Sequence, residues 1–298
     1  MKYSLTFFIC LIISGFSFAQ TDELTAAEEE AFQKVIDSIE NSFSYQYGEI
    51  DLQDGLAKLK VPEGYKFLDE TQSAYVLTQL WGNPPSEVLG LLFPEEISPI
   101  SDNFTYAVEI EYSEEGYIDD DDAGDIDYDE LLAEMKKDVS DANSQRMEQG
   151  YGSMDLIGWA SAPFYDHANK KLHWAKELKF EDAEVNTLNY NIRVLGRKGY
   201  LNMNAIGDID VLPVFNRDID KILASVEFTK GNRYSDFNPD MDDVAAYGIG
   251  GLIAGKILAK AGFFAVILKF WKIIAVGAIG LFGVFKKKIF GQKDDGNA

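Results

Sequence analysis

The sequence has 298 residues, enough for one large domain or two ordinary ones, and 46% of them are hydrophobic, as in a folded protein. Its formal charge of −23 is unevenly distributed: residues 20–243 carry 48 acidic and 18 basic side chains, whereas residues 244–298 carry 2 acidic and 8 basic ones. So acidic a main segment repels phosphate backbones, which argues against nucleic acid as a partner.

The first 19 residues are predicted to be a secretory signal peptide. Lys2 precedes an apolar run, and Ser17 and Ala19 supply the small residues that a signal peptidase requires. An uncleaved N-terminal anchor is the alternative. The only cysteine, Cys10, lies inside this run, so the chain from residue 20 onward has no thiol for a disulfide, a zinc–thiolate site or a nucleophile.

Residues 20–231 are predicted to form an extracytoplasmic α+β domain. Apolar residues at helical spacing predict a helix over 21–41, and alternation around Q-D-G at residues 53–55 predicts a β-hairpin. Asp69 is placed to cap a helix that ends at G-N-P-P, because a glycine and two prolines stop helices.

The second half of this domain is predicted to be mostly strand. Strands are expected over 88–93 and 104–112, and a long helix over 128–149. Four further strands (156–160, 172–180, 187–195 and 200–205) and a helix over 211–224 follow. Short links between consecutive strands favour antiparallel pairing, so the predicted fold is an antiparallel sheet with helices packed on one face.

A polar linker (232–243), a membrane-anchoring helical region (244–288) and a polar tail (289–298) are predicted to complete the chain. The charge-free runs are each shorter than the roughly 20 residues that cross a bilayer as a helix. One spanning helix over about 262–285 and a helical hairpin turning near Gly262 both fit, and the distribution of lysines hardly separates them. A hairpin buried in a soluble protein is the third arrangement.

The run I-D-D-D-D-A-G-D-I-D-Y-D-E-L-L (residues 118–132) contains eight carboxylates, and it has two interpretations. The spacing of an EF-hand loop would place ligands at Asp119, Asp121, Asp127 and Glu130, with Gly124 at the sharp turn. However, Ala123 stands at a ligand position, and the preceding segment is a strand. Asp127 as the cap of the following helix, with Glu130 in its first turn, explains more of the residues, so a solvated helix start is favoured over a weak cation site.

Other candidate sites are weaker. His167 and His173 flank a turn and could hold a metal with Asp166, but turn and strand-surface histidines explain them equally. Core packing similarly explains Trp159, Phe164, Tyr165 and Trp174 better than a ligand platform does. The sequence has no G-x-S-x-G elbow, glycine-rich phosphate loop or H-E-x-x-H, so we predict neither a catalytic residue nor a cofactor.

Several long motifs resemble one family. They are G-Y-K-F-L-D (64–69), Y-V-L-T-Q-L-W-G-N-P-P (75–85), W-A-K-E-L-K-F (174–180), N-T-L-N-Y-N-I-R-V-L-G-R-K-G (186–199), G-N-R-Y-S-D-F-N-P (231–239) and V-A-A-Y-G-I-G-G-L-I-A-G-K (244–256). Together they resemble the uncharacterised bacterial family of predicted membrane-anchored proteins, domain of unknown function 2167. The resemblance implies a signal peptide, an extracytoplasmic domain and a C-terminal membrane segment, and it implies no functional residue.

The sequence therefore leads us to expect a binding or scaffolding module of the bacterial envelope, tethered to the plasma (inner) membrane with its main domain outside. Its expected partners are the membrane and an envelope protein. Two alternatives are a carboxylate-dependent envelope hydrolase and a divalent-cation sensor that uses residues 119–130.

Overall fold

The computed structural model describes residues 26–83, 85–101, 104–148, 152–181 and 183–255. The expected signal peptide, the polar tail and residues 256–288 of the expected membrane-anchoring region lie outside the described residues. No helix in the described part of the chain is both long and apolar enough to span a bilayer.

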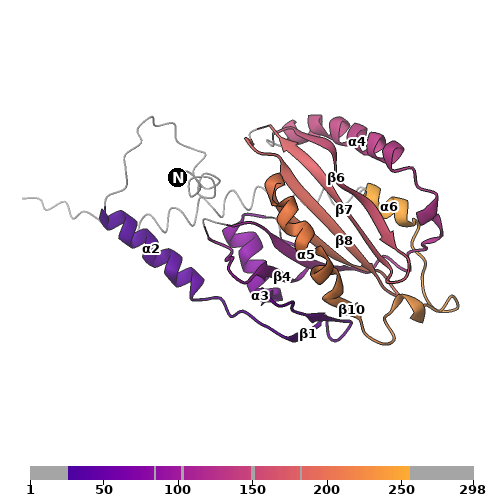
Figure 1. Ribbon diagram of the computed structural model, residues 1–298, viewed down its shortest axis with the longest axis horizontal. Helices are drawn as coiled ribbons and strands as arrows, with labels where there is room; N and C mark the ends of the chain where they lie inside the picture. The colour runs from indigo at the N-terminus through magenta and orange to yellow at the C-terminus, as the bar shows by residue number, and fades with distance from the viewer. Residues whose placement is uncertain (1–25, 84, 102–103, 149–151, 182, 256–298) are drawn as a thin grey trace, which may run out of the picture. The chain divides into compact units, whose positions relative to one another are not determined.

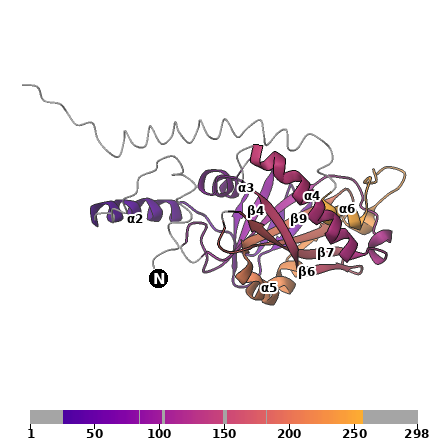
Figure 2. The same cartoon turned by 90° about the horizontal axis from the view of Figure 1, so that it is seen from above.

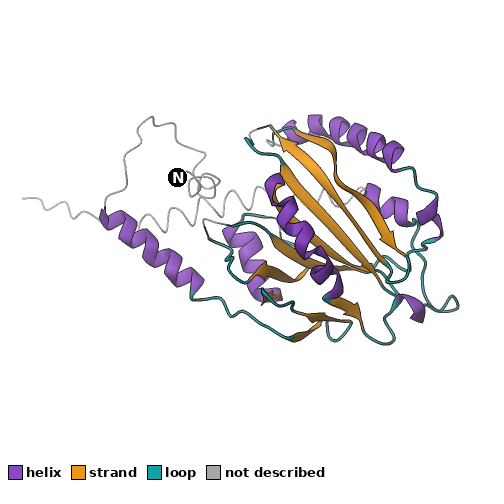
Figure 3. Cartoon of the chain, viewed as in Figure 1, coloured by secondary structure: helices purple, strands orange, loops and turns teal. Residues whose placement is uncertain are grey.

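A seven-stranded antiparallel sheet forms the centre of the fold (Figures 1 and 3). Its strand order is β3-β4-β5-β9-β8-β7-β6, and each neighbouring pair is antiparallel. The strands are β3 (Tyr65–Asp69), β4 (Val88–Pro94), β5 (Ala107–Ser113), β6 (Met154–Asp166), β7 (Lys171–Phe180), β8 (Thr187–Leu195) and β9 (Tyr200–Asp208). The α+β class with antiparallel pairing is thereby confirmed.

The helices are divided between the two faces of this sheet, whereas we predicted one covered face. Helix α5 (Leu212–Ala224) covers one face, where the ring of Phe215 packs 5.1 Å from that of Tyr106 and 4.5 Å from that of Tyr190. Helices α3 (Glu70–Tyr75) and α4 (Tyr128–Glu148) lie on the opposite face (Figure 2).

For the α3 region, the physical reason is the composition of β4. Leu92 belongs to the large core beneath α5, whereas its neighbours Leu91 and Phe93 belong to a second buried cluster with Val76 and Leu77 of the α3 region. A strand that is apolar on both sides needs cover on both sides.

The expected hairpin forms from β1 (Glu49–Leu52) and β2 (Ala57–Lys60), and it belongs to a separate three-stranded sheet. The third strand, β10 (Val226–Phe228), comes from the far end of the domain and pairs with β2. We predicted neither β10 nor β3, because β10 has only three residues and four of the five residues of β3 are buried, so β3 lacks the alternation of a half-buried strand.

The helix boundaries agree with the expected ones to within a few residues. Helix α2 spans Ala26–Glu40, and α3 continues through a π-helical turn (Val76–Leu80) to Trp81. The cap at Asp69 is confirmed, since its carboxylate accepts the N–H of Gln72 at 3.0 Å.

Residues 232–243, for which we predicted a linker, pack against the domain. They include a short 3-10 turn (Tyr234–Asp236) with the buried side chain of Tyr234. They lead into α6 (Ile249–Ala254), which ends at Gly255 in the left-handed conformation typical of a helix terminus.

Candidate functional site

The acidic segment begins after β5 and leads into α4, and several of its carboxylates accept hydrogen bonds from backbone N–H groups. The Oδ1 atom of Asp127 accepts the N–H groups of Asp129 and Glu130, both at 3.0 Å, which confirms the expected helix cap. Asp119 Oδ1 likewise accepts the N–H of Asp121 at 2.9 Å.

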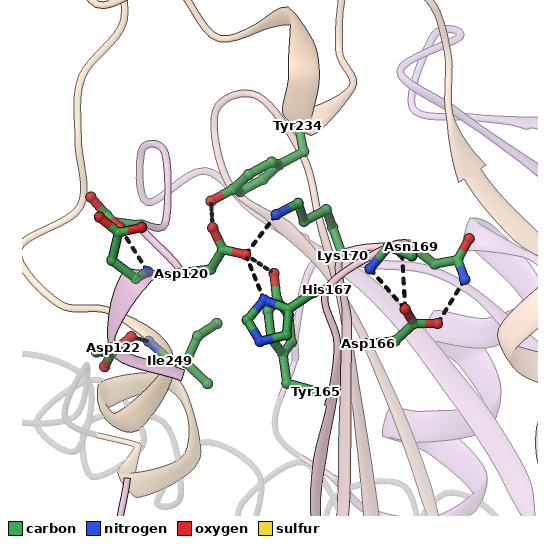
Figure 4. Close-up of polar contacts among 12 residues, drawn as sticks. Asp120, Asp122, Tyr165, Asp166, His167, Asn169, Lys170, Tyr234 and Ile249 are labelled. Atoms are coloured by element: carbon green, nitrogen blue, oxygen red, sulfur yellow. Dashed lines mark hydrogen bonds and ion pairs between the residues drawn. The ribbon is translucent and has the colours of Figure 1, made fainter. Parts of the chain in front are cut away.

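Asp120 is the most heavily bonded residue of this segment (Figure 4). Its Oδ2 atom accepts from Tyr165 Oη and Lys170 Nζ, each at 2.7 Å, and its Oδ1 atom accepts from Tyr234 Oη at 2.8 Å. His167 Nδ1 lies 3.6 Å from Oδ2. The Asp120 side chain is only 13% exposed, so these donors replace most of its water.

The electrostatics keep the Asp120 carboxylate ionised and the Tyr165 hydroxyl neutral near neutral pH. Burial alone would raise the pKa of Asp120, but the hydrogen bonds from Lys170, Tyr165 and Tyr234 outweigh it and lower the pKa to about 2. Burial, together with the neighbouring carboxylate, raises the pKa of Tyr165 above its ordinary value. A general acid or base needs a pKa near the working pH, so this geometry is that of a structural node.

Asp122 connects the acidic segment to the end of the described chain. Its two carboxylate oxygens accept the N–H groups of Ile249, at 2.8 Å, and Gly250, at 3.0 Å, and so cap α6 (Figure 4). A Cβ atom at Gly248 would lie 2.5 Å from Asp122 Oδ1, so a side chain there would displace the capping carboxylate.

Further bonds hold residues 231–255 on the domain. The N–H of Tyr117 donates to Asp243 O, and the N–H of Ala245 donates to Tyr117 O, both at 2.8 Å. The ring of Tyr117 stacks on that of Phe237 at 3.9 Å, and Arg197 Nε donates to Asp242 Oδ2 at 2.7 Å. We call these contacts, with those of Asp120 and Asp122, the C-terminal clamp.

The structure brings only part of the predicted calcium loop together. Ligand atoms of Asp119, Asp120 and Asp121 lie within 4.8 Å of one another, and in the described ranges no other group of three such residues does so. Asp127 is engaged in its helix cap, and neither it nor Glu130 joins the cluster.

The two histidines are not brought together. His167 lies in the β6–β7 turn beside Asp120, whereas His173 lies on β7, where its Nδ1 atom is 2.9 Å from Tyr190 Oη. Burial lowers the pKa of His173, which favours its neutral form. Asp166 bonds the N–H groups of its own turn at Ala168 and Asn169.

The four aromatic residues that we considered as a ligand platform do not lie together. Trp174 and Tyr165 are buried, and Trp159 Nε1 donates to Tyr128 O at 3.2 Å. Phe164 is 58% exposed. They do not form a shared ligand platform.

A second polar site, which the sequence did not reveal, lies on the sheet face opposite α5. The register aligns Trp174, Asn191, Asn204 and Glu109 in one row across β7, β8, β9 and β5. Arg193, Asn202 and Glu111 form the next row. We call the polar residues of this face the polar strip: Glu109, Glu111, Lys176, Asn189, Asn191, Arg193, Asn202 and Asn204.

Amide groups link the charges of the polar strip. Arg193 Nη1 donates to Asn202 Oδ1, and Asn202 Nδ2 donates to Glu111 Oε2 at 2.8 Å. The Arg193 guanidinium also lies 5.1 Å from the ring of Trp174, within cation–π range. Trp174 Nε1 is buried on the same face and has no hydrogen-bond partner among the described residues.

In the polar strip, burial raises the pKa of a carboxyl group and lowers the pKa of a lysine. Burial, and to a smaller extent the neighbouring carboxylate of Glu111, raises the pKa of Glu109 to about 7. Burial, and to a smaller extent the positive charge of Arg193, lowers the pKa of Lys176 to about 8. Groups shifted so far toward neutrality cluster at functional sites more often than elsewhere.

A weak sequence signal for this strip exists. E-x-E at residues 109–111, N-x-N-x-R at 189–193 and N-x-N at 202–204 alternate with apolar residues along their strands. Such alternation is also what a solvated sheet face produces, so the pattern by itself did not indicate a site.

The fold and these two sites define an α+β domain with an antiparallel sheet, a clamped C-terminal segment and a polar strip. The chain belongs to the family described as "Protein of unknown function (DUF2167)", whose sequence model matches residues 44–283. No curated protein matches the sequence.

The solved structures similar to this chain include the following two. The solution structure of cyanobacterial PsbP (CyanoP) from Synechocystis sp. PCC 6803 has 14% sequence identity and a TM-score of 0.36, over 62% of this chain and 93% of the other. The Ran-binding protein Mog1p of Saccharomyces cerevisiae has 8% identity and a TM-score of 0.33, over 66% of this chain and 100% of the other.

Proposed function

We propose that this protein is a binding or scaffolding module of the bacterial envelope, tethered to the plasma membrane by its apolar C-terminal region, with the α+β domain on the extracytoplasmic side. The apolar runs at the two ends of the sequence support this proposal, as does the excess of lysine in residues 244–298.

The observation that carries the proposal is the C-terminal clamp. A domain attached through a free linker would sample many orientations above a bilayer. Here Asp122 caps α6, and Tyr234 is bonded to Asp120, so the chain leaves the domain at a defined place just before the long apolar region. A chain held on the domain as far as Gly255 supports a module that presents one defined surface to a partner.

Thiol labelling tests the location, because the sequence from residue 11 onward has no cysteine. Met147 is 55% exposed and Met203 is fully buried, so Met147→Cys and Met203→Cys form a matched pair. A membrane-impermeant maleimide is expected to label Met147→Cys in intact spheroplasts and Met203→Cys only after denaturation. Labelling of Met147→Cys only after lysis, or release of the protein by carbonate, would contradict the proposal.

The binding role needs a separate experiment. Crosslinking in intact cells followed by affinity purification is expected to recover the full chain with a reproducible envelope partner. Repeated recovery of the protein alone, without partner or ligand, would count against a scaffolding role.

A hydrolase is the second candidate, and Glu109 is the observation that favours it. A carboxyl with a pKa of about 7, beside a second carboxyl at Glu111, has the property that general acid–base catalysis requires. The test is turnover of ester, glycan and peptide substrates by the purified protein and by Glu109→Gln. Equal rates for the two proteins would exclude Glu109 as the catalytic group.

A further inference from the structure

The charged groups of the polar strip form no direct ion pair among the described residues. Among these residues, no carboxylate lies within ion-pair distance of Lys176 or Arg193, and no cation lies within that distance of Glu109 or Glu111. Cations are on β7 and β8, and carboxylates are on β5, with asparagine side chains between them.

This arrangement lowers the stability of the fold, and a purely structural sheet face would not need such charges. Partly buried charges lose hydration, and a direct ion pair would recover part of that loss. An apolar sheet face, like the one beneath α5, would avoid the cost altogether. Separated charges of opposite sign are instead suited to a ligand that carries both complementary charges.

The spacing of the strands limits the length of that ligand. The backbones of Arg193 on β8 and Glu111 on β5 are two strand spacings apart, which is about 10 Å. An extended peptide of about three residues spans this distance. The amides of Asn191 and Asn204 lie between the two ends, and an asparagine side chain can both donate to and accept from a peptide group.

Exposure differs among the members of the polar strip. Asn191 is buried, but the other seven members of the strip are partly exposed. The unpaired Trp174 Nε1 supplies a further donor on the same face as Lys176 and Arg193.

We propose that the polar strip binds a short zwitterionic peptide, whose carboxylate lies at Lys176 and Arg193 and whose ammonium group lies at Glu109 and Glu111. The inference goes beyond the proposed function and does not rest on it, because binding to the purified chain is independent of where the protein is located.

The experiment measures binding of trialanine to the full chain by calorimetry, and the melting temperature in the same buffer. N-acetyl-trialanine amide has the same backbone but no charges. Lys176→Met and Glu109→Gln each remove one charge of the strip, and Lys179→Met is the matched control at an exposed position of the same strand. Folding of each variant is verified by its unliganded melting temperature.

Trialanine is expected to bind and to raise the melting temperature, and the blocked peptide is expected to do neither. Lys176→Met and Glu109→Gln are expected to weaken binding about tenfold or more, while Lys179→Met binds like the wild type. Because an unpaired charge is removed, Lys176→Met is also expected to melt at a higher temperature without ligand. Absence of binding, equal binding of both peptides, or equal affinities of Lys176→Met and Lys179→Met would each overturn the proposal.

Discussion

The carboxylate of Asp120 accepts a hydrogen bond from the hydroxyl of Tyr234 at 2.8 Å, although 114 residues separate them in the chain. The same carboxylate is bonded to Tyr165 and Lys170 at the end of the β6–β7 hairpin. The acidic segment thus joins three distant parts of the domain, and this role explains why the Asp120 carboxylate is largely shielded from solvent.

Breaking this node is expected to destabilise the whole domain. Asp120→Asn leaves Lys170 without its partner and is expected to lower the free energy of unfolding by about 2–4 kcal/mol, whereas Tyr234→Phe removes one hydrogen bond and should cost about 1–2 kcal/mol. Urea unfolding followed by fluorescence measures both. Asp125→Asn, at an exposed position of the same acidic run, is the control, and an equal effect at Asp120 and Asp125 would refute the assignment.

Asp122 is expected to act locally. Asp122→Ala removes the cap of α6, which is worth about 1 kcal/mol, so the amide hydrogens of Ile249 and Gly250 should exchange about fivefold faster. Hydrogen exchange by mass spectrometry resolves this segment from the sheet. The neighbouring exposed Asp121→Ala should leave exchange there unchanged, and unchanged protection in Asp122→Ala would show that the cap is not needed.

Glu109 is expected to make stability fall as the pH rises. Its folded pKa of about 7 lies above the ordinary value of 4.5, so the folded state holds this proton more tightly than the unfolded state. Its contribution is fully present below pH 4.5 and is lost as the pH rises through about 7.

The comparison of wild type with Glu109→Gln isolates this contribution from those of Glu111, Arg193 and Lys176 on the same face. Glu109→Gln should be more stable than wild type by about 1–3 kcal/mol near pH 7.5, and the difference should vanish near pH 4.5. Urea unfolding at the two pH values measures it. A difference that is the same at both values would show that Glu109 does not titrate in this range.

Calcium is expected to leave the melting temperature unchanged at about 1 mM, a concentration at which extracellular calcium modules are occupied. The reason is that Asp120 already accepts from Lys170 and two tyrosines, while Asp127 is engaged as a helix cap. Differential scanning fluorimetry with calcium and with magnesium is the measurement. A rise of several degrees that Asp119→Asn abolishes would establish a cation site after all.

The sequence by itself determined the elements whose signals are local. The strand over 187–195 was predicted with the boundaries that β8 has, and the caps at Asp69 and Asp127 were predicted from the residues that follow them. Alternation and capping act over a few residues, so a single sequence contains them in full.

Only the tertiary structure decided the sites. The partners of Asp120 lie 45 to 114 residues away, and nothing near Asp120 indicates which of the neighbouring aspartates will be buried. The polar strip likewise depends on the register of four strands, since pairing alone brings Glu109 into line with Asn204 and Asn191. Contacts between segments distant in the chain are set by packing of the whole sheet, and a sheet face acquires its partners only when the strands are assembled.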